Sequence, residues 1–182
     1  AAGVAIGDYD NDGLQDIFLS RQQDGGKLYR NLGEFQFSDV TVDAGIISDG
    51  MWSTGVSFID INGDGWLDLY VCGFDSRNRL YINHEGKFIE SAKKYGLDFK
   101  GASVSMAFSD FDRDGDIDAY LLTNRLESTD LTANAKIIND KNKPLQVHPD
   151  SRELGYFVKP PGRVPILINA GQYDYLYRND NG

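Results

Sequence analysis

The chain has 182 residues, of which 41% are hydrophobic and 12% aromatic, so it carries enough apolar material for a packed core and is not a disordered sequence. Its formal net charge of −10 argues against nucleic acid as a partner, because a phosphate backbone is bound by a concentrated Lys/Arg surface. No apolar run approaches the ~18 residues that a membrane-spanning helix needs, so we expect no membrane insertion.

Four short apolar segments in the first fifty residues predict β-strands. They lie at Gly3–Ile6, Asp16–Ser20, Lys27–Asn31 and Phe37–Val42. Runs of aliphatic, aromatic and β-branched residues bounded by Gly and Asp are typical of strands that are buried on both faces. The Asp-rich segment Asp8–Asp16 between the first two strands is then expected to form the tip of a β-hairpin.

The same order of segments recurs twice. The acidic segments begin at residues 8, 60 and 110, which are 52 and 50 residues apart. Apolar segments follow the same order at 55–59, 68–72, 79–83 and 88–92, and again at 105–109, 118–122 and 175–179. A period of about 50 residues with four short antiparallel strands predicts an all-β chain of β-propeller blades, with units of about 1–50, 51–100 and 101–182. A β-sandwich with three coincidental acidic turns is the alternative.

Each acidic loop carries the oxygen donors that a hard divalent cation needs. Asp or Asn occupies positions 1, 3, 5 and 9 around a Gly at position 6, and the backbone carbonyl at position 7 adds another oxygen. The predicted ligands are Asp8, Asp10, Asp12, Leu14 and Asp16; Asp60, Asn62, Asp64, Trp66 and Asp68; and Asp110, Asp112, Asp114, Asp116 and Asp118. Three Ca²⁺ sites are therefore predicted, with the second the weakest because Asn62 removes one negative charge. A solvated acidic turn without metal is the alternative.

An EF-hand is excluded for these loops. The EF-hand needs a helix on each side and a Glu at loop position 12, where this chain has Leu19, Val71 and Leu121.

Further motifs accompany the loops: Trp52–Phe58 before the second loop, Leu80-Tyr-Ile-Asn83 after it, and Phe37–Ile46 in the first unit. The hairpins resemble the FG-GAP/VCBS repeats of seven-bladed propellers such as the integrin α-subunit head. The fuller pattern is similar to the cartilage-acidic-protein-like and ASPIC/UnbV-associated bacterial proteins. Two departures are Asn62, where Asp is usual, and a degraded fourth-strand motif at Phe88–Gly96.

The resemblance also implies a metal, a ring size and a cellular location. It implies Ca²⁺ in the acidic loops and a larger, seven-bladed ring, completed by the remaining blades of the same propeller or by another copy. It also implies an extracytoplasmic location, whether secreted, periplasmic or at the surface of a bacterial cell.

The third unit contains an insertion at about residues 124–172, between its second and third strands. From Leu28 to Leu80 is 52 residues, whereas from Leu80 to Leu176 is 96. Because strands in a blade alternate in direction, the insertion is expected on the face opposite the metal loops. Part of Leu126–Asp140 is expected to form a short helix, and an excursion of this length is usually either functional or disordered.

Two classes of function follow. The favoured one is a non-catalytic binding or scaffold module that holds a protein or glycan ligand through the insertion face. The alternative is a polysaccharide-acting lyase or hydrolase, for which His148, Asp150 and Glu153 form the only candidate cluster. The sequence shows no nucleophile–base arrangement at a recognisable spacing, so no catalytic residue is predicted.

Overall fold

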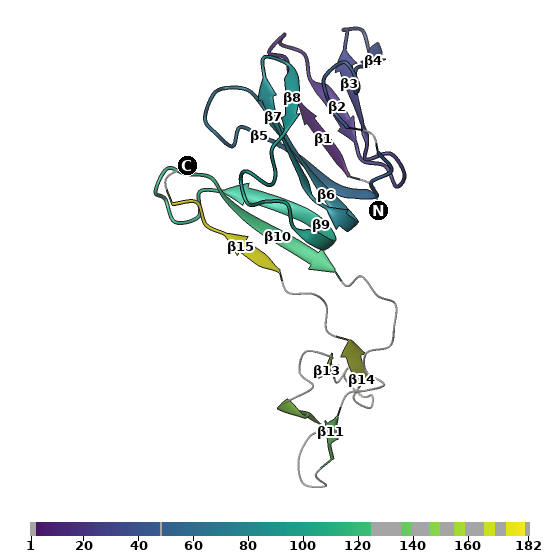
Figure 1. Ribbon diagram of the computed structural model, residues 1–182, viewed down its shortest axis with the longest axis vertical. Helices are drawn as coiled ribbons and strands as arrows, with labels where there is room; N and C mark the ends of the chain where they lie inside the picture. Colours follow the sequence, from purple (N-terminus) through teal and green to yellow (C-terminus); the bar gives the residue numbers. More distant parts are fainter. Residues whose placement is uncertain are drawn as a thin grey trace. The chain divides into compact units, whose positions relative to one another are not determined.

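The structure is a computed structural model of the chain (Figure 1). It describes residues 3–47, 49–124, 136–139, 146–149, 155–158, 166–169 and 174–180. Every helix or strand assigned in these ranges is a β-strand, which confirms the predicted all-β class. No helix long and apolar enough to cross a bilayer occurs in this part of the chain. The chain divides into two compact units, Ala1–Asn124 with Tyr173–Gly182, and Arg125–Gln172.

The larger unit contains three antiparallel blades. The first blade is β1 (Val4–Gly7), β2 (Asp16–Leu19), β3 (Lys27–Asn31) and β4 (Phe37–Asp39), paired in chain order. The second blade is β5 (Ser53–Ile59), β6 (Asp68–Arg77), β7 (Arg79–His84) and β8 (Lys87–Glu90). The third blade contains β9 (Lys100–Ser109), β10 (Asp118–Asn124) and β15 (Tyr175–Tyr177). The predicted strand order within a blade is confirmed.

The second and third blades are joined by main-chain hydrogen bonds. The first half of β6 pairs with β5 and β7, while its far end pairs with the start of β9, in the register Phe74↔Ala102 and Arg77↔Lys100. The register shifts around Asp75, whose φ of 53° marks a β-bulge. This long shared strand makes one seven-stranded sheet of the two blades, which the repeat pattern did not predict.

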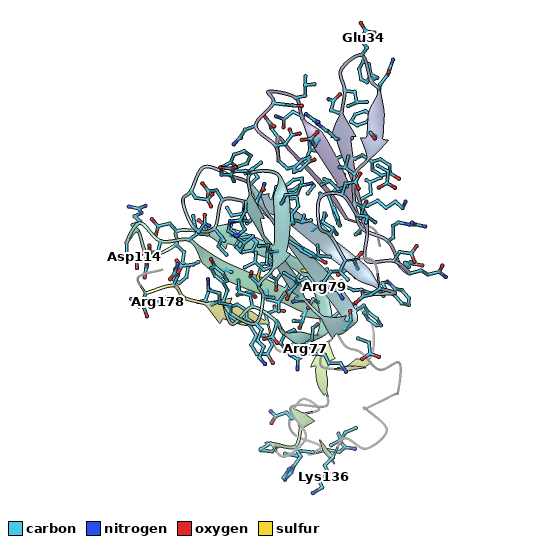
Figure 2. The ribbon with its side chains drawn as sticks, turned by 45° about the horizontal axis from the view of Figure 1, so that its top comes forward. Glu34, Arg77, Arg79, Asp114, Lys136 and Arg178 are labelled. Atoms are coloured by element: carbon cyan, nitrogen blue, oxygen red, sulfur yellow. The ribbon has the colours of Figure 1, made fainter. Side chains whose placement is uncertain are left out.

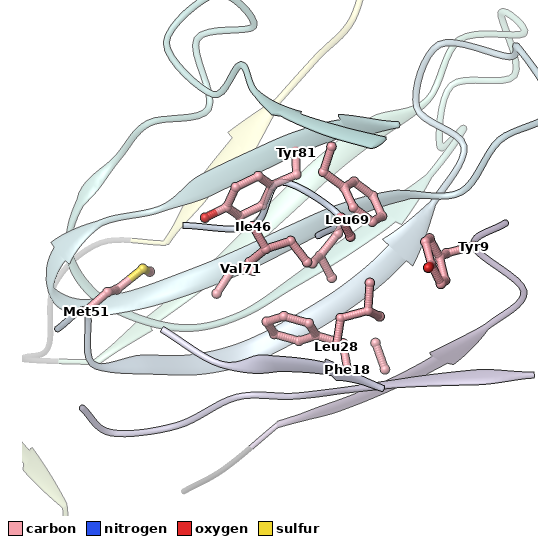
Figure 3. Close-up of a cluster of buried hydrophobic side chains, with 11 residues drawn as sticks. Tyr9, Phe18, Leu28, Ile46, Met51, Leu69, Val71 and Tyr81 are labelled. Carbon is pink, nitrogen blue, oxygen red and sulfur yellow. The ribbon is translucent and has the colours of Figure 1, made fainter. Parts of the chain in front are cut away.

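Apolar side chains fill the space between successive blades. One cluster lies between the first and second blades and includes Phe18, Leu28 and Leu69 (Figure 3). A second lies between the second and third blades and includes Tyr70 and Leu121. Because side chains alternate along a strand, successive residues of β6 enter the two clusters in turn, and the second blade is buried on both sides.

Burial on both faces was predicted for every unit, and for the first and third blades that prediction is wrong. Val4 and Ile6 on β1 are 55% and 63% exposed, and Tyr120 and Leu122 on β10 are 45% and 41% exposed. The physical reason is that each of these blades has a neighbouring blade on one side only, within the described part of the chain.

The smaller unit contains two short hairpin sheets. They pair β11 (Ile137–Ile138) with β12 (Gln146–Val147), and β13 (Gly155–Val158) with β14 (Ile166–Asn169). A short helix was expected in part of Leu126–Asp140; within that segment Ile137–Ile138 form a strand, which their β-branched side chains favour. Most of the rest of that segment lies outside the described residues.

Candidate metal centres

The predicted metal ligands lie at the tips of three equivalent β-hairpins. The hairpins β1–β2, β5–β6 and β9–β10 close with the pairs Gly7↔Asp16, Ile59↔Asp68 and Ser109↔Asp118. Each pair comes directly before and after an acidic loop, so the loops project from the same end of their blades.

The same hydrogen bonds hold all three loops. The carboxylate of Asp8, at position 1, accepts the backbone N–H groups of Asp12 at 3.1 Å and Gly13 at 2.8 Å. Asp60 accepts the equivalent two at 3.0 and 2.8 Å, and Asp110 accepts them at 3.2 and 3.1 Å. The carboxylate at position 5 accepts the N–H of position 7 at 2.9, 2.9 and 3.0 Å. The two carboxylates thus satisfy the amides of a tight loop.

Backbone conformation explains the invariant glycine at position 6. Gly13, Gly65 and Gly115 have φ values of 88°, 86° and 100°, in the left-handed region that disfavours side chains. A Cβ at any of the three would meet no atom within 4 Å, so conformation rather than space requires glycine.

The aspartate at position 9 is buried and connects each loop to the third strand of its blade. Asp16, Asp68 and Asp118 are 0%, 0% and 1% exposed. One oxygen of each accepts the N–H of position 2 at 3.1 Å. The other accepts the N–H of Asn31, Asn83 or Asn179, at 2.8, 2.7 and 2.8 Å respectively.

Burial affects the titration of these aspartates. It raises the pKa of Asp68 to about 6, although the hydrogen bonds from Asn83 and Ile61 act in the opposite direction. Burial also raises the pKa of Asp16. The sequence analysis missed the role of the three asparagines, which the recurring Leu-Tyr-x-Asn motif could have indicated.

The carboxylates of the first and third loops converge. One oxygen from each of Asp8, Asp10 and Asp16 lies within 4.8 Å of the others, and the same holds for Asp110, Asp112 and Asp114. Asp10 Oδ1 is buried and has no hydrogen-bond partner. Burial raises the pKa of Asp10, although the positive charge of Arg30 acts in the opposite direction. Clustered carboxylates with an unpartnered oxygen fit a hard divalent cation.

The second loop fits a cation less well. Position 3 of this loop is Asn62, so the loop offers one carboxylate fewer than it would with the aspartate of the first and third loops. The Asn62 Nδ2 group instead donates to Asp64 Oδ2 at 2.9 Å, while Asn62 Oδ1 accepts the Asp64 N–H at 3.1 Å. The amide thereby gives Asp64 a neutral hydrogen-bond donor within the loop. The carbonyls of Leu14, Trp66 and Asp116 remain predicted ligands.

Two arginines that the sequence analysis did not single out lie against the acidic loops. Arg30 Nε pairs with Asp10 Oδ2 at 2.7 Å, and its NH2 group donates to Asp12 Oδ2 at 2.9 Å. Arg178 Nε lies 3.2 Å from Asp112 Oδ2 (Figure 2). Each arginine directly precedes the asparagine of a Leu-Tyr-x-Asn motif: Arg30 lies in β3, and Arg178 directly follows β15.

A cavity of about 720 Å³ lies between the second and third blades and is lined by residues that include Tyr95, Ala119 and Tyr177. At the equivalent place between the first and second blades, the space is filled by Phe88, which stacks on Tyr9 at 5.7 Å between ring centroids. Phe88 belongs to a fourth strand, and β15 has no such partner in the part of the chain that the structure describes. We therefore interpret the cavity as space between blades rather than as a ligand site.

Of the candidate cluster His148, Asp150 and Glu153, the structure describes only His148. The backbone N–H of His148 donates to the Lys136 carbonyl at 2.8 Å. Asp150 and Glu153 lie outside the described residues, so the enzymatic alternative stays a prediction.

Comparison with known proteins gives one result. A sequence model of a family described as FG-GAP-like repeat matches residues 8–71 and 60–121. The matched segments together cover more than half of the chain, and each runs from the first aspartate of one acidic loop into the strand after the next loop. No curated protein matches the chain.

Proposed function

This chain belongs to the FG-GAP-like repeat family, and we propose that it is a Ca²⁺-stabilised β-propeller module that binds a glycan or protein partner outside the cytoplasm. The observation that carries the proposal is the convergence of carboxylates at equivalent hairpin tips, with a buried Asp10 oxygen that lacks a partner. The finer likeness to the integrin head and to the cartilage-acidic-protein-like and ASPIC/UnbV-associated proteins is part of this proposal.

The cation would be held by the side chains at positions 1, 3, 5 and 9 of each loop, together with the carbonyl at position 7. Bound there, it would neutralise carboxylates that otherwise repel one another, each pair by about 1 kcal/mol at ~4 Å in water. Five or six protein oxygens in a flexible loop suit Ca²⁺, whereas Mg²⁺ demands a smaller octahedron and keeps its waters. Sites of this kind in extracellular modules have Kd values of order 10⁻⁴ to 10⁻³ M, which supports a location where free Ca²⁺ is high.

Thermal unfolding with and without Ca²⁺ tests the metal-binding part of the proposal. At a Kd of about 10⁻⁴ M, 1 mM Ca²⁺ stabilises the fold by about 1.4 kcal/mol per site. We expect the Tm in 1 mM Ca²⁺ to exceed that in EGTA by several degrees, and Mg²⁺ to give a smaller shift. Asp10→Asn should reduce the shift, whereas Asp43→Asn, which removes the same charge from an exposed turn of the first blade, should not. An identical Tm in Ca²⁺ and EGTA would contradict the proposal.

Partner binding is proposed for the end of the blades opposite the metal loops. The strand β10 starts at its acidic loop and ends at Asn124, so the chain leaves the third blade at the end remote from that loop. At the same end of the second blade lie Arg77 and Arg79, which Figure 2 labels. Together with Lys93 they line a groove of about 390 Å³. Arg77 pairs with Asp98 at 2.7 Å and Arg79 pairs with Asp49. The lining carries these three cations against two carboxylates, Glu90 and Asp98, and this excess of positive charge in an acidic protein favours a partner that presents anionic groups.

Screening acidic and neutral glycans and peptides tests this second part. We expect replacement of residues 125–172 by a short Gly-containing turn to leave the Ca²⁺-dependent Tm shift intact and to abolish binding of the ligand that the screen identifies. Arg79→Ala should weaken binding, and Arg21→Ala, which removes a half-exposed arginine of the first blade, should not. Turnover of a polysaccharide that His148→Ala abolishes would instead favour the enzymatic alternative.

A further inference from the structure

We infer that Arg30 and Arg178 are internal counter-cations of the first and third loops, which stabilise the metal-free loops and lower their affinity for a divalent cation. This inference rests on the proposed Ca²⁺ binding. It concerns the Ca²⁺ affinity of each loop, which the positions of the ligands alone do not determine.

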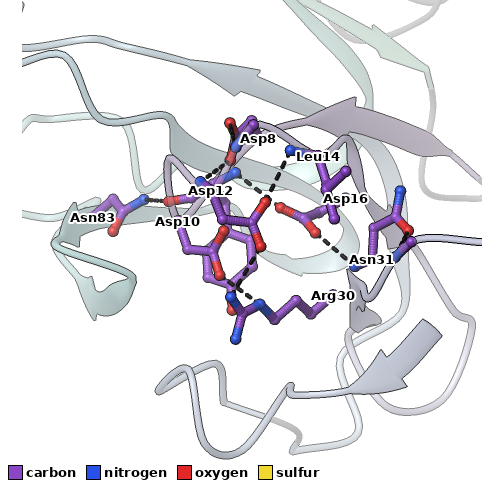
Figure 4. Close-up of polar contacts among 11 residues, drawn as sticks. Asp8, Asp10, Asp12, Leu14, Asp16, Arg30, Asn31 and Asn83 are labelled. Atoms are coloured by element: carbon purple, nitrogen blue, oxygen red, sulfur yellow. Dashed lines mark hydrogen bonds and ion pairs between the residues drawn. The ribbon is translucent and has the colours of Figure 1, made fainter. Parts of the chain in front are cut away.

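The two carboxylate oxygens of Asp10 differ in their partners, because Arg30 contacts only one of them. The guanidinium contacts Asp10 Oδ2 and Asp12 Oδ2, at 2.7 and 2.9 Å, and Asp10 Oδ1 is left buried and unpartnered (Figure 4). Arg30 Nε is itself buried, so this is not a fully solvated surface pair. A cation bound through Oδ1 would therefore share the Asp10 carboxylate with a fixed positive charge. That charge neutralises the loop without metal and repels the metal when it binds.

The three blades provide an internal comparison. The residue before the Leu-Tyr-x-Asn asparagine is Arg30 in the first blade and Arg178 in the third, and these pair with Asp10 and Asp112 at loop position 3. In the second blade the corresponding residue is Ile82, which is 4% exposed within the core shared with the third blade. Loop position 3 in that blade is the neutral Asn62. An arginine is thus present only in the two blades where position 3 is charged.

Counting these arginines changes the expected order of affinities. The first loop has four aspartates and one arginine, which give a local charge of −3; the second loop has three aspartates and no arginine, which also give −3. Acid count alone ranks the second site as the weakest. With Arg30 included, the charges of the first two loops are equal. At the third loop the effect should be smaller, because Arg178 also pairs with Asp180 at 2.6 Å.

The test replaces Arg30 by isoleucine, the residue of the second blade, and compares it with Arg30→Lys, which keeps the charge. Arg21→Ile is the matched control, because Arg21 is a half-exposed cation of the same blade whose partner is Asp24 rather than a loop carboxylate. Ca²⁺ is titrated into ¹⁵N-labelled protein, and the amides of Gly13, Gly65 and Gly115 report each loop separately. The Tm in EGTA is measured in parallel.

We expect Arg30→Ile to tighten Ca²⁺ binding reported by Gly13 about tenfold, because a guanidinium and a divalent cation that share one carboxylate repel each other. The Kd reported by Gly65 should stay unchanged. The Tm in EGTA should fall by about 3 °C as the acidic loop loses its counter-charge. Arg30→Lys and Arg21→Ile should both keep the wild-type Kd at Gly13 within about threefold.

An unchanged or weaker Kd at Gly13 in Arg30→Ile, with the wild-type protein binding Ca²⁺ normally, would overturn the inference and make Arg30 a residue that positions Asp10 and Asp12. A wild-type protein in which none of the three glycine amides responds to millimolar Ca²⁺ would overturn the proposed metal binding itself, and this inference with it.

Discussion

Replacing Asn83 by alanine should destabilise the protein by about 3 kcal/mol, because this one buried side chain connects two blades. Asn83 is 0% exposed. Its Nδ2 group donates to the carbonyl of Tyr9, in the loop of the first blade, at 2.7 Å, and to the carbonyl of Leu67 at 2.9 Å. Its Oδ1 accepts the N–H of Gly86 at 2.8 Å. Alanine would remove all three hydrogen bonds.

The magnitude follows from the partners that are left behind. A buried polar group without a hydrogen-bond partner costs about 1–3 kcal/mol, and two of these three bonds are only partly buried, so we take about 1 kcal/mol for each. For a chain of this size, a loss of about 3 kcal/mol lowers the Tm by roughly 10 °C.

Thermal and urea unfolding in EGTA would measure this loss without a contribution from metal. Asn31→Ala is the matched control, since Asn31 has the same place in the first blade and both of its side-chain bonds stay within that blade. Its Nδ2 group donates to the carbonyl of Gln15 at 3.0 Å, and its Oδ1 accepts the N–H of Gly33 at 2.9 Å. We expect Asn31→Ala to cost about 2 kcal/mol, which is about 1 kcal/mol less than Asn83→Ala. Equal losses in the two variants would refute the reasoning, because the bond from Asn83 to Tyr9 would then contribute nothing.

Two further predictions concern the stability of the blades. Asp39 accepts hydrogen bonds from Lys27 and Thr41, which lower its pKa to about 2, so its contribution is complete above about pH 4 and is lost as pH falls toward 2. Asp39→Asn should abolish this acid-dependent loss in urea titrations, with a cost below about 1 kcal/mol at pH 7 because the side chain is 38% exposed. Phe88→Ala should lower the free energy of unfolding by about 3–5 kcal/mol, because Phe88 is 4% exposed and lies between two tyrosine rings. Ile89 is 54% exposed, so Ile89→Ala should lower it by less than about 0.5 kcal/mol in the same assay.

The acidic loops were predictable from sequence because the interactions that shape them are local. In the first loop, Asp8 bonds the amides of residues four and five positions later, and Asp12 bonds the amide two positions later. The left-handed conformation of Gly13 is likewise a property of one residue and its neighbours. Such contacts repeat wherever the nine-residue pattern repeats, so spacing alone located the loops and the hairpins that present them.

The strands were predictable for a related reason, but which of their faces is buried was not. The strand β6 is buried on both faces between two blades. The strand β1 is also apolar in sequence, but its Val4 and Ile6 are more than half exposed. An apolar pattern indicates that a face can be buried, and only a neighbouring blade decides whether it is. Within Leu126–Asp140, where a short helix was expected in part, Ile137–Ile138 form a strand, since a short apolar run fits either a helix or a strand.

The contacts that distinguish one loop from another were decided only by the tertiary structure. Asn83 reaches Tyr9 across 74 positions of the chain, and Arg30 reaches Asp10 and Asp12 from another strand. A repeat pattern shows which residues are equivalent, but not which neighbours each one meets. The sequence by itself therefore determined the blades and the positions of the acidic loops. The structure decided their burial and their counter-charges, because both depend on residues that are distant in the chain and adjacent only after folding.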